Sequence, residues 1–427
     1  MTGQALTPHE WLAQVLFALA HRLLGLNGVV LVTALIISTT FTIIFSESLE
    51  GNRMPAISLA ITTLAAIASS LHWLARPHVL TVLFLAVWTL LLERVRHGKD
   101  APTWAFGLLM FLWANTHGAF LAGFVTWGAY LAGELFEVWE TRQWANNRLK
   151  VWAMIGLISL AATFINPAGF QLWGTSIGFI SNRYLVSHTQ EYMPPDFHIP
   201  GTWPFLLMIA LSIIVLGSNQ KPLPFAHRLL LSGWAIMGLY SARNIPLFAI
   251  IASPILSGIA ANNLSNSSWK VVENNLLKTD KNLRGAMWII ISVLAALVLM
   301  STPVMRDYNR FNKAIFPVDA VNWLEKNPQE GRAFNYFTWG GYLLYRQWPK
   351  ILVFIDGQTD FYGETLTREY EQIISTSPGW ENTLNKYEIQ WAIIPTRSNL
   401  ASVLSVKGWE ALYQDETAVI LENKTMP

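Results

Sequence analysis

Residues 72–99 have the sequence HWLARPHVLTVLFLAVWTLLLERVRHGK. Residues 78–93 form an apolar run that can cross a bilayer with some tilt. A polar cluster precedes this run, and the basic loop 94–99 follows it. Because Lys and Arg collect on the cytoplasmic side of membrane proteins, we predict a transmembrane helix with residues 72–78 at the outer face.

The same pattern recurs along the chain up to residue 303. We expect about nine or ten transmembrane helices within 28–303, one at each of these apolar runs: 28–45, 54–71, 78–93, 103–116, 117–138, 151–165, 203–217, 227–241, 244–261 and 286–300. With Arg53 and the loops 94–99, 142–150, 221–228 and 270–284 in the cytoplasm, 13 Lys and Arg residues lie inside. Four lie outside, at Arg22, Arg76, Arg183 and Arg243.

The composition agrees with a membrane protein. Of the 427 residues, 52% are hydrophobic and only 13% are charged, against about 25% in soluble proteins, which excludes a simple water-soluble enzyme and a disordered chain. The absence of cysteine excludes disulfides, thiol catalysis and cysteine-based metal sites. Since no dense basic run accompanies the net charge of +2, we do not expect nucleic acid as a partner.

The first 27 residues do not fit a simple series of crossings. Residues 11–24, WLAQVLFALAHRLL, form a helical run that is too short to span the bilayer. We expect 1–27 to be an amphipathic segment on the outer face. Met1 would then lie outside with no signal-like sequence to export it, so either this helix crosses or an initial span is absent from the chain.

Residues 304–427 alternate strand-like and helical stretches. Strands are expected at 332–337 (RAFNYF), 351–356 (ILVFID) and 389–395 (IQWAIIP), with a closing hairpin in 409–423. We predict a C-terminal α/β domain with a largely parallel sheet. It follows the last span and is therefore expected outside the cytoplasm.

Polar clusters from several spans are expected to meet at the outer face, and none faces the other side. They are HEW (9–11), HWLARPH (72–78), NTHG (115–118), NPAG (166–169), EYMPPDFH (191–198) and SARN (241–244). Their convergence predicts a cavity at the outer membrane interface, capped by the C-terminal domain. Each cluster alone also has a structural interpretation, either as a helix end anchored at lipid headgroups or as a turn.

A site that transfers a group from a lipid phosphate needs two kinds of residue. One is a carboxylate that takes the proton from the attacking hydroxyl, for which the candidates at this face are Glu10, Glu191 and Asp196. The other is a cation that neutralises the departing phosphate, for which the candidates are Arg76, His78, His117 and Arg243. Further substrate contacts are expected from His9, Asn115 and His198. A divalent metal ion held by Glu191, Asp196 and His198 is a weaker hypothesis.

In chain order, the motifs HEWL, ARPH, ANTHG, NPAGFQLW, PDFH, SARNIPLF, WGGYLLYRQWP and VFIDGQTDFYG resemble a family of bacterial multi-spanning proteins of the GT-C glycosyltransferase type. GT-C enzymes use polyprenyl-phosphate-linked sugars at the outer membrane face, and many carry a soluble domain after the last span. They usually place a catalytic acid in the first outer loop, after an initial span. This chain begins within that loop, so the resemblance implies that the span and its acid are absent and leaves Glu10 as the base.

Two motifs of the C-terminal domain add candidate substrate contacts. Trp339 and Tyr342 lie where oligosaccharyltransferases carry an aromatic-rich motif, but the acid of that motif is absent, so peptide recognition is not implied. Asp356 and Asp360 follow a predicted strand, where loop acids often bind ligands. A turn-forming Asp-Gly pair is an alternative explanation.

The resulting hypothesis is a glycosyltransferase of the bacterial cytoplasmic (inner) membrane. It would move a sugar from a polyprenyl-phosphate-linked donor to a saccharide, lipid or protein acceptor of the envelope. A transporter or flippase of a lipid-linked saccharide is an alternative that predicts inverted repeats and ionisable residues at the bilayer midplane. A non-catalytic scaffold of an envelope-polysaccharide assembly is a third hypothesis.

Overall fold

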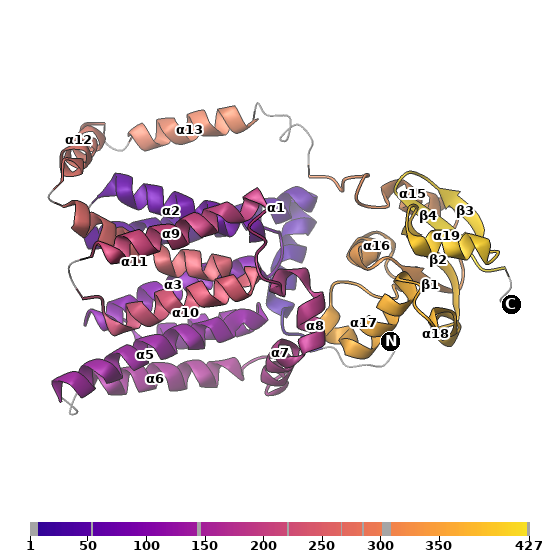
Figure 1. The fold of residues 1–427 in the computed structure, drawn as a ribbon, viewed down its shortest axis with the longest axis horizontal. Helices are drawn as coiled ribbons and strands as arrows, with labels where there is room; N and C mark the ends of the chain where they lie inside the picture. The colour runs from indigo at the N-terminus through magenta and orange to yellow at the C-terminus, as the bar shows by residue number, and fades with distance from the viewer. Residues whose placement is uncertain are drawn as a thin grey trace. The chain divides into compact units, whose positions relative to one another are not determined.

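The computed structural model describes residues 7–52, 54–142, 147–219, 222–265, 267–283, 286–300 and 309–424. These residues form two units, shown in Figure 1. The helical unit comprises residues 7–178 and 189–300, and the α/β unit comprises residues 179–188 and 309–424. Three charges that were used to predict sidedness lie outside the described residues, namely Arg53, Lys221 and Arg284. The outermost parts of the predicted terminal segments also lie outside them.

The helical unit consists of long helices joined by short turns. Its α-helices are α1 (Trp11–Asn52), α2 (Pro55–Ser69), α3 (His78–Arg96), α4 (Thr103–Ala114), α5 (Leu121–Thr141), α6 (Asn147–Thr163), α7 (Gln171–Ser181, whose last residues belong to the α/β unit), α9 (Trp203–Gly217), α10 (Phe225–Tyr240), α11 (Ile245–Leu264), α12 (Trp269–Asn282) and α13 (Ala286–Met300). Short 3-10 helices lie at η1 (Ser70–His72), η2 (Gly118–Phe120), η3 (Gln190–Tyr192), η4 (Pro200–Thr202) and η5 (Ala242–Asn244).

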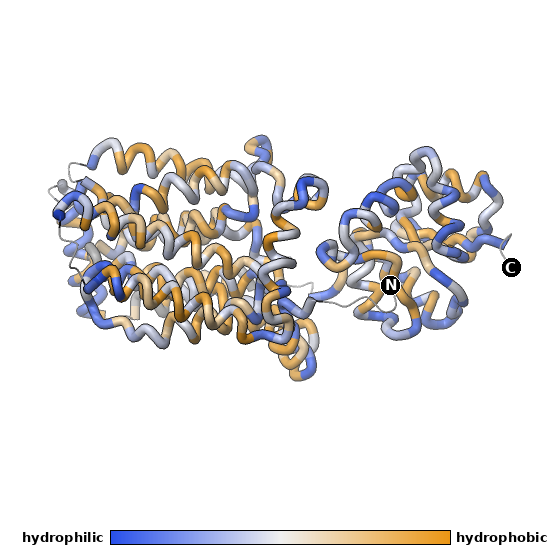
Figure 2. The backbone as a smooth tube through the Cα atoms, turned by 90° about the horizontal axis from the view of Figure 1, so that it is seen from below, coloured by the Kyte–Doolittle hydropathy of each residue, from blue (hydrophilic) through white to orange (hydrophobic). Residues whose placement is uncertain are grey.

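Six segments of the described chain are long and apolar enough to cross a membrane, which fits the predicted membrane protein. They are Trp11–Glu50, Pro55–His72, His78–Arg96, Gly118–Thr141, Pro200–Gly217 and Ala242–Leu264. Other expected spans form shorter helices of 12, 17, 16 and 15 residues, namely α4, α6, α10 and α13. Figure 2 shows the hydrophobic middle of the long helices and the hydrophilic residues at their ends. Whether the shorter helices also cross remains a prediction.

The first helix contains a break. Leu24 and Gly25 leave helical geometry, and Gly25 has φ 61°, a conformation that glycine adopts at no steric cost. This break separates residues 11–23 from the rest of α1, close to the predicted boundary between the first helical run and the first span. The placement of the first part on the membrane surface remains a prediction.

Large aromatic side chains and the most enclosed helix, α11, form the centre of the helical unit. Trp88, Trp113 and Trp152 are completely buried, and α11 packs against α1, α2, α9 and α10. Because the helices alternate in direction, several connections meet at one end of the bundle, which we call the outer end. The segments there are 7–10, 72–78, 115–117, 189–199 and 241–244.

The α/β unit has a four-stranded sheet of order β1-β2-β4-β3 among its described residues. The strands are β1 (Arg332–Asn335), β2 (Ile389–Pro395), β3 (Glu410–Gln414) and β4 (Ala418–Glu422). Apolar side chains alternate along β2 and β4 and so fill a core on each face. The remaining elements are α8 (Arg183–His188), α15 (Val318–Lys326), η6 (Phe337–Trp339), α16 (Gly340–Gln347), α17 (Thr359–Ile374), α18 (Trp380–Lys386) and α19 (Asn399–Val406).

The prediction of a largely parallel sheet is wrong. Only β1 and β2 pair in parallel, whereas β4 pairs antiparallel with both β2 and β3. The closing hairpin, β3–β4, is confirmed, and it is this hairpin that adds the antiparallel pairs beside β2. The predicted strands at 332–337 and 389–395 are confirmed as β1 and β2.

The predicted strand 351–356 does not join the sheet ladder. Its backbone instead bonds to the side chain of Asn335, which is fully buried at the end of β1. Asn335 Oδ1 accepts from the Phe354 N–H at 2.7 Å, and Asn335 Nδ2 donates to the Ile355 carbonyl at 2.8 Å. An amide side chain offers the same donor and acceptor as a peptide group, so it replaces the strand partner here.

Residues 179–188 pack on α17 within the α/β unit. Asn182 Nδ2 donates a hydrogen bond to Glu364 Oε2 at 3.0 Å. The Arg368 guanidinium lies 3.6 Å from the centre of the Tyr184 ring, a cation–π contact. The short α8 helix is therefore held on the α/β unit by polar contacts.

Candidate functional site

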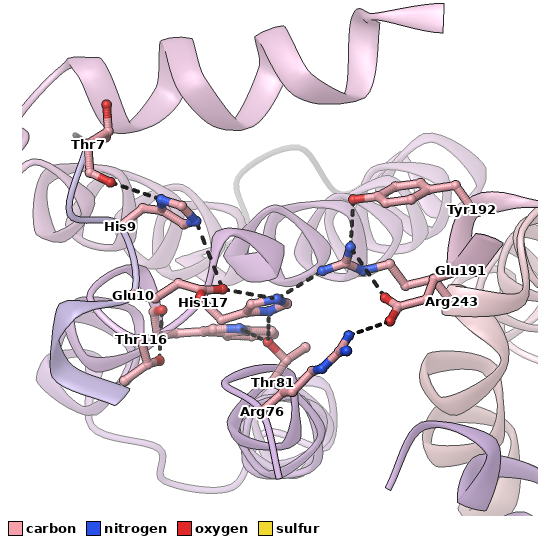
Figure 3. A network of polar contacts seen from close by, with 11 residues as sticks. Thr7, His9, Glu10, Arg76, Thr81, Thr116, His117, Glu191, Tyr192 and Arg243 are labelled. Carbon is pink, nitrogen blue, oxygen red and sulfur yellow. Dashed lines mark hydrogen bonds and ion pairs between the residues drawn. The ribbon is translucent and has the colours of Figure 1, made fainter. Parts of the chain in front are cut away.

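Arg243 is the centre of a polar network at the outer end, shown in Figure 3. It lies in η5, the turn between α10 and α11. Its Nη2 donates to His117 Nε2 at 2.9 Å, and its Nη1 donates to the Tyr192 hydroxyl at 2.7 Å. The guanidinium carbon also lies 4.9 Å from the centre of the Tyr192 ring. The closest carboxylate with which it forms an ion pair is Glu191, whose Oε2 is 4.0 Å away.

Glu191 joins the two arginines of the network. Its Oε1 accepts a hydrogen bond from Arg76 Nη1 at 2.9 Å, while its Oε2 faces Arg243. Arg76 is largely exposed and Glu191 is partly exposed. One carboxylate thus interacts with two guanidinium groups. Because the Arg76–Glu191 pair lies close to the surface, it contributes little to the stability of the fold.

His117 is buried between Arg243 and α3. Its Nδ1 lies 2.8 Å from Thr81 Oγ1, which also accepts from Trp113 Nε1 at 2.9 Å. A guanidinium can only donate hydrogen bonds, so His117 Nε2 must accept, and we assign the proton to Nδ1. Burial, followed by the charge of Arg243, lowers the pKa of His117 well below its usual value. The imidazole is therefore neutral and presents a lone pair to Arg243.

Glu10 approaches the same imidazole from the start of α1. Its Oε1 lies 3.7 Å from His117 Nε2 and 3.9 Å from His9 Nε2. The other ring nitrogen of His9 is 3.0 Å from the Thr7 carbonyl. The Glu10 side chain is about a quarter exposed, at 26%, so a bound substrate can reach it.

The histidines of the α2–α3 connection hold backbone segments together. His72 Nε2 lies 3.0 Å from the Ala242 carbonyl, next to Arg243. His78 Nε2 lies 2.5 Å from the His72 carbonyl, and its ring centre is 6.4 Å from that of His117. These contacts place η1 beside η5. The predicted role of His78 in phosphate binding remains a prediction.

The side-chain amide of Asn115 makes three hydrogen bonds within the protein. Its Oδ1 accepts from Trp11 Nε1 at 2.7 Å, and its Nδ2 donates to the carbonyls of Phe111 and Ile165 at 2.8 and 2.9 Å. These bonds connect the start of α1 to the ends of α4 and α6. The predicted substrate contact through Asn115 remains a prediction, which no contact in the structure favours.

Asp196 and His198 form an exposed turn apart from the network. Asp196 Oδ1 accepts from the His198 backbone N–H and lies 2.9 Å from His198 Nδ1. These two hydrogen bonds lower the pKa of Asp196. Within the described residues, no three His, Asp or Glu side chains are placed to hold a metal ion. The suggested site of Glu191, Asp196 and His198 is thus not formed there.

Trp339 and Tyr342 are core residues of the α/β unit, 2% and 4% exposed. Trp339 Nε1 donates to the Ile315 carbonyl at 2.8 Å, and the Tyr342 hydroxyl accepts from Arg346 at 2.9 Å. Between them, Gly340 packs so closely on residues 355–356 that a Cβ would lie 2.3 Å from the Ile355 oxygen. Packing thus accounts for Trp339, Gly340 and Tyr342, and the predicted substrate contacts of Trp339 and Tyr342 remain predictions.

The two loop acids of the α/β unit differ in burial. Asp356 is 5% exposed, and its Oδ1 accepts from the Gln358 N–H at 2.8 Å. Burial raises its pKa, although the hydrogen bonds from Gln358 and Tyr362 act in the opposite direction. Asp360 lies in the first turn of α17. The predicted substrate contacts of Asp356 and Asp360 remain hypotheses. Of the two, Asp356 is the one whose burial costs free energy, because it takes a carboxyl group out of water.

Sequence reasoning missed several polar contacts. Only its position in the sequence linked either Tyr192 or Thr81 to the site. Tyr192 follows Glu191, and Thr81 lies one helical turn after His78. The expectation that polar clusters occur only at the outer face is wrong. In the last turn of α3, Glu93 Oε1 accepts from the Tyr130 hydroxyl and from His227 Nε2, both at 2.6 Å. This second cluster lies at the opposite end from His78, because the two residues are at opposite ends of one helix.

Comparisons with known proteins identify the fold. The chain matches no described protein family and no curated protein significantly. Among solved structures it resembles AglB, the oligosaccharyltransferase of Archaeoglobus fulgidus, in complex with an inhibitory peptide and a dolichol-phosphate. That match has 13% identity and a TM-score of 0.53, and covers 99% of this chain and 67% of AglB. It also resembles ArnT of Cupriavidus metallidurans bound to undecaprenyl phosphate, with 14% identity, a TM-score of 0.49, and coverage of 96% of this chain and 86% of ArnT.

Proposed function

We propose that this chain, which has the GT-C membrane glycosyltransferase fold, transfers a sugar from a polyprenyl-phosphate-linked donor to an envelope acceptor at the outer end. The observation that carries the proposal is the network around Arg243, with two arginines, two carboxylates and a neutral imidazole at one end of the bundle. AglB, the similar structure, is bound to a dolichol-phosphate. A lipid phosphate is thus the ligand to test first.

Arg243 is the proposed phosphate ligand. Two of its acceptors, His117 Nε2 and the Tyr192 hydroxyl, are neutral, and the acid in its ion pair is 4.0 Å away. Its positive charge is therefore only partly compensated. A phosphate offers oxygens that match the fork of guanidinium N–H groups and would gain charge-assisted hydrogen bonds there. Arg76 can contribute a second cation when a phosphate displaces Glu191.

Glu10 is the proposed general base, and Glu191 a positioning residue. Glu191 accepts a hydrogen bond from Arg76 and faces Arg243, so it holds the two guanidinium groups in place. Glu10 lies beside two imidazoles, with its Oε1 3.7 Å from His117 Nε2 and 3.9 Å from His9 Nε2. From there it can take the proton of an acceptor hydroxyl. Asp196 lies in the exposed turn and is the weakest of the three candidates.

The test is transfer in vesicles, measured as polyprenyl phosphate released from a panel of polyprenyl-phosphate sugars. We expect Arg243→Gln to lower kcat/KM by roughly 100-fold or more, the scale of losing one preorganised charge at a transition state. Arg243→Lys should recover part of it. The exposed Arg142→Gln is the matched control and should be unaffected.

The two carboxylates are distinguished by the same assay. Glu10→Gln should lower kcat with little change in the affinity for undecaprenyl phosphate, whereas Glu191→Gln should mainly change that affinity. The exposed Glu140→Gln is the control for both. Unchanged transfer in both Arg243→Gln and Glu10→Gln would reject the proposed site.

A further inference from the structure

The helix α12, Trp269–Asn282, has an exposed apolar stripe. Trp269, Val272 and Leu276 recur at the spacing of one helix face. Trp269 is 52% exposed and Val272 is 45% exposed, and Glu273 is the only buried residue of the helix. Such a helix leaves apolar surface without a protein partner in the described part of the chain.

A positively charged stripe lies on roughly the opposite side of the helix from the apolar one. On a helical projection, Lys270, Lys278 and Lys281 share an arc that also includes Asn274. No acidic side chain of the described residues forms an ion pair with any of these three lysines. The helix thus combines exposed apolar side chains with three lysines that have no ion-pair partner among the described residues.

Glu273 fixes where this helix lies. Its two carboxylate oxygens accept from the backbone N–H groups of Ala56 and Ile57, each at 3.0 Å, at the start of α2. Unpaired N–H groups and the helix dipole make a helix N-terminus a favourable place for a carboxylate. The other end of α2 leads to His72 at the outer end. Accordingly, α12 lies at the opposite end of the helical unit, as Figure 1 shows.

We propose that α12 lies flat in the lipid headgroup layer at that end, with its apolar stripe among acyl chains and its lysines on anionic phosphates. The chain connections favour a bilayer over a soluble partner, because the membrane-spanning α11 ends at Leu264 and the apolar α13 begins at Ala286. Two short links therefore hold the helix at the membrane edge. Amphipathic helices with Lys on the polar side bind such interfaces. This inference does not depend on the proposed enzymatic function.

The chain contains no cysteine, so single cysteines can report the surroundings of α12 without background. The whole protein is placed in vesicles of phosphatidylcholine with phosphatidylglycerol and labelled with an environment-sensitive fluorophore. In the Val272→Cys variant, we expect quenching by a lipid-attached quencher and protection from aqueous iodide. In Asn274→Cys, on the lysine face, we expect the reverse.

The lysines are tested in the Val272→Cys background. Replacing Lys270, Lys278 and Lys281 with Gln should lower the ratio of lipid-exposed to water-exposed label roughly fivefold per lysine in anionic vesicles. Vesicles of phosphatidylcholine alone should show little change. A matched triple change of exposed lysines in the α/β unit, Lys326, Lys350 and Lys407 to Gln, should have no effect.

Three results would overturn the proposal. If iodide reaches the labels at 272 and 274 equally, α12 lies in water. If neither quencher reaches the label at 272, a protein surface covers the apolar stripe. If the lysine changes have the same effect with and without anionic lipid, the charges do not bind phosphates.

Discussion

At the residue scale, the outer network depends on one imidazole tautomer. His117 accepts from Arg243 at Nε2 only while its proton stays on Nδ1, and Thr81 is the hydrogen-bond partner of that nitrogen. The opposite tautomer would place an N–H against the guanidinium. Thr81 is thus a positioning residue for Arg243, although it need not touch a substrate.

This dependence predicts an effect of Thr81→Val. Without the hydroxyl, the Nδ1–H tautomer loses its partner, and the affinity for undecaprenyl phosphate should fall about five- to tenfold, the equivalent of one buried hydrogen bond of about 1 kcal/mol. Titration of the purified protein with that lipid measures the change. Thr81→Ser keeps the hydroxyl and should bind as the native protein does, so equal losses in both variants would contradict the role of the hydrogen bond.

A buried acid in the α/β unit makes stability depend on pH. Burial raises the pKa of Asp356 above its usual 3.8, so the folded protein binds this proton more tightly than the unfolded chain does. The contribution of Asp356 to stability is therefore most favourable below 3.8 and is lost as the pH rises through the folded pKa.

Asp356→Asn should raise the thermal midpoint of the α/β unit at pH 7, and the gain should shrink as the pH is lowered toward 4. The measurement is thermal unfolding of the full chain, monitored by hydrogen exchange in β2. Glu330→Gln, at an exposed position, is the control. A gain that does not change with pH would show that ionisation of Asp356 is not its cause.

The site illustrates what the sequence could predict at this scale. Charged residues of turns, such as Arg76, Glu191 and Arg243, could be assigned to one end of the bundle because the apolar runs fix where each turn lies. Partners such as Thr81 could not, because a threonine inside an apolar helix carries no sign of the imidazole it contacts. Contacts between distant turns require the packing of the helices.

At the scale of elements, the α/β unit shows why strand-like sequence did not predict pairing. Residues 351–356 are apolar enough for a central strand, yet the Asn335 amide takes their backbone hydrogen bonds. Alternation of strands and helices suggested a parallel sheet, but the β3–β4 hairpin lies next to β2 and makes most pairs antiparallel. The composition of residues 351–356 favours an extended backbone, but the Asn335 side chain takes the hydrogen bonds that would pair these residues with a neighbouring strand.

Asn335→Ala tests this replacement of a strand partner. It leaves the Phe354 N–H and the Ile355 carbonyl buried without their partner, and we expect the α/β unit to lose about 2–3 kcal/mol. Hydrogen exchange in β1 and β2 of the full chain measures the loss. The exposed Asn385→Ala should change stability by less than about 0.5 kcal/mol. Equal exchange in the two variants would contradict the importance of the amide.

Gly340 and Gly341 form a matched pair at the junction of η6 and α16. A Cβ at Gly340 would lie 2.3 Å from the Ile355 oxygen, whereas one at Gly341 meets nothing within 4 Å. We expect Gly340→Ala to destabilise the α/β unit by about 1–3 kcal/mol and Gly341→Ala to be neutral or stabilising by up to about 1 kcal/mol. Denaturation of the two variants compares them. Similar losses would show that α16 does not pack closely on residues 355–356.

At the scale of the whole molecule, the few charges of the helical unit are divided between its two ends. The outer end carries the network of Arg76, Glu191 and Arg243, while the opposite end carries Glu93 with Tyr130 and His227. Figure 2 shows mostly hydrophobic residues along the middle of the long helices, between their more hydrophilic ends. A charged residue within the bilayer is expensive, so this separation follows from the membrane. It also means that the orientation of the bundle decides which cluster faces which compartment.

The positive-inside rule predicts that orientation, and single cysteines in the cysteine-free chain can test it. In intact spheroplasts, a membrane-impermeant maleimide should label Asp196→Cys at the outer end and Asn327→Cys in the α/β unit. Lys99→Cys, in the basic loop after α3, should be labelled only after the membrane is permeabilised. Labelling of Lys99→Cys in intact spheroplasts would invert the bundle and place the Arg243 network in the cytoplasm, where an envelope acceptor could not reach it. Labelling of Asp196→Cys without Asn327→Cys would instead put the α/β unit on the cytoplasmic side, which requires an odd number of crossings between residues 196 and 327.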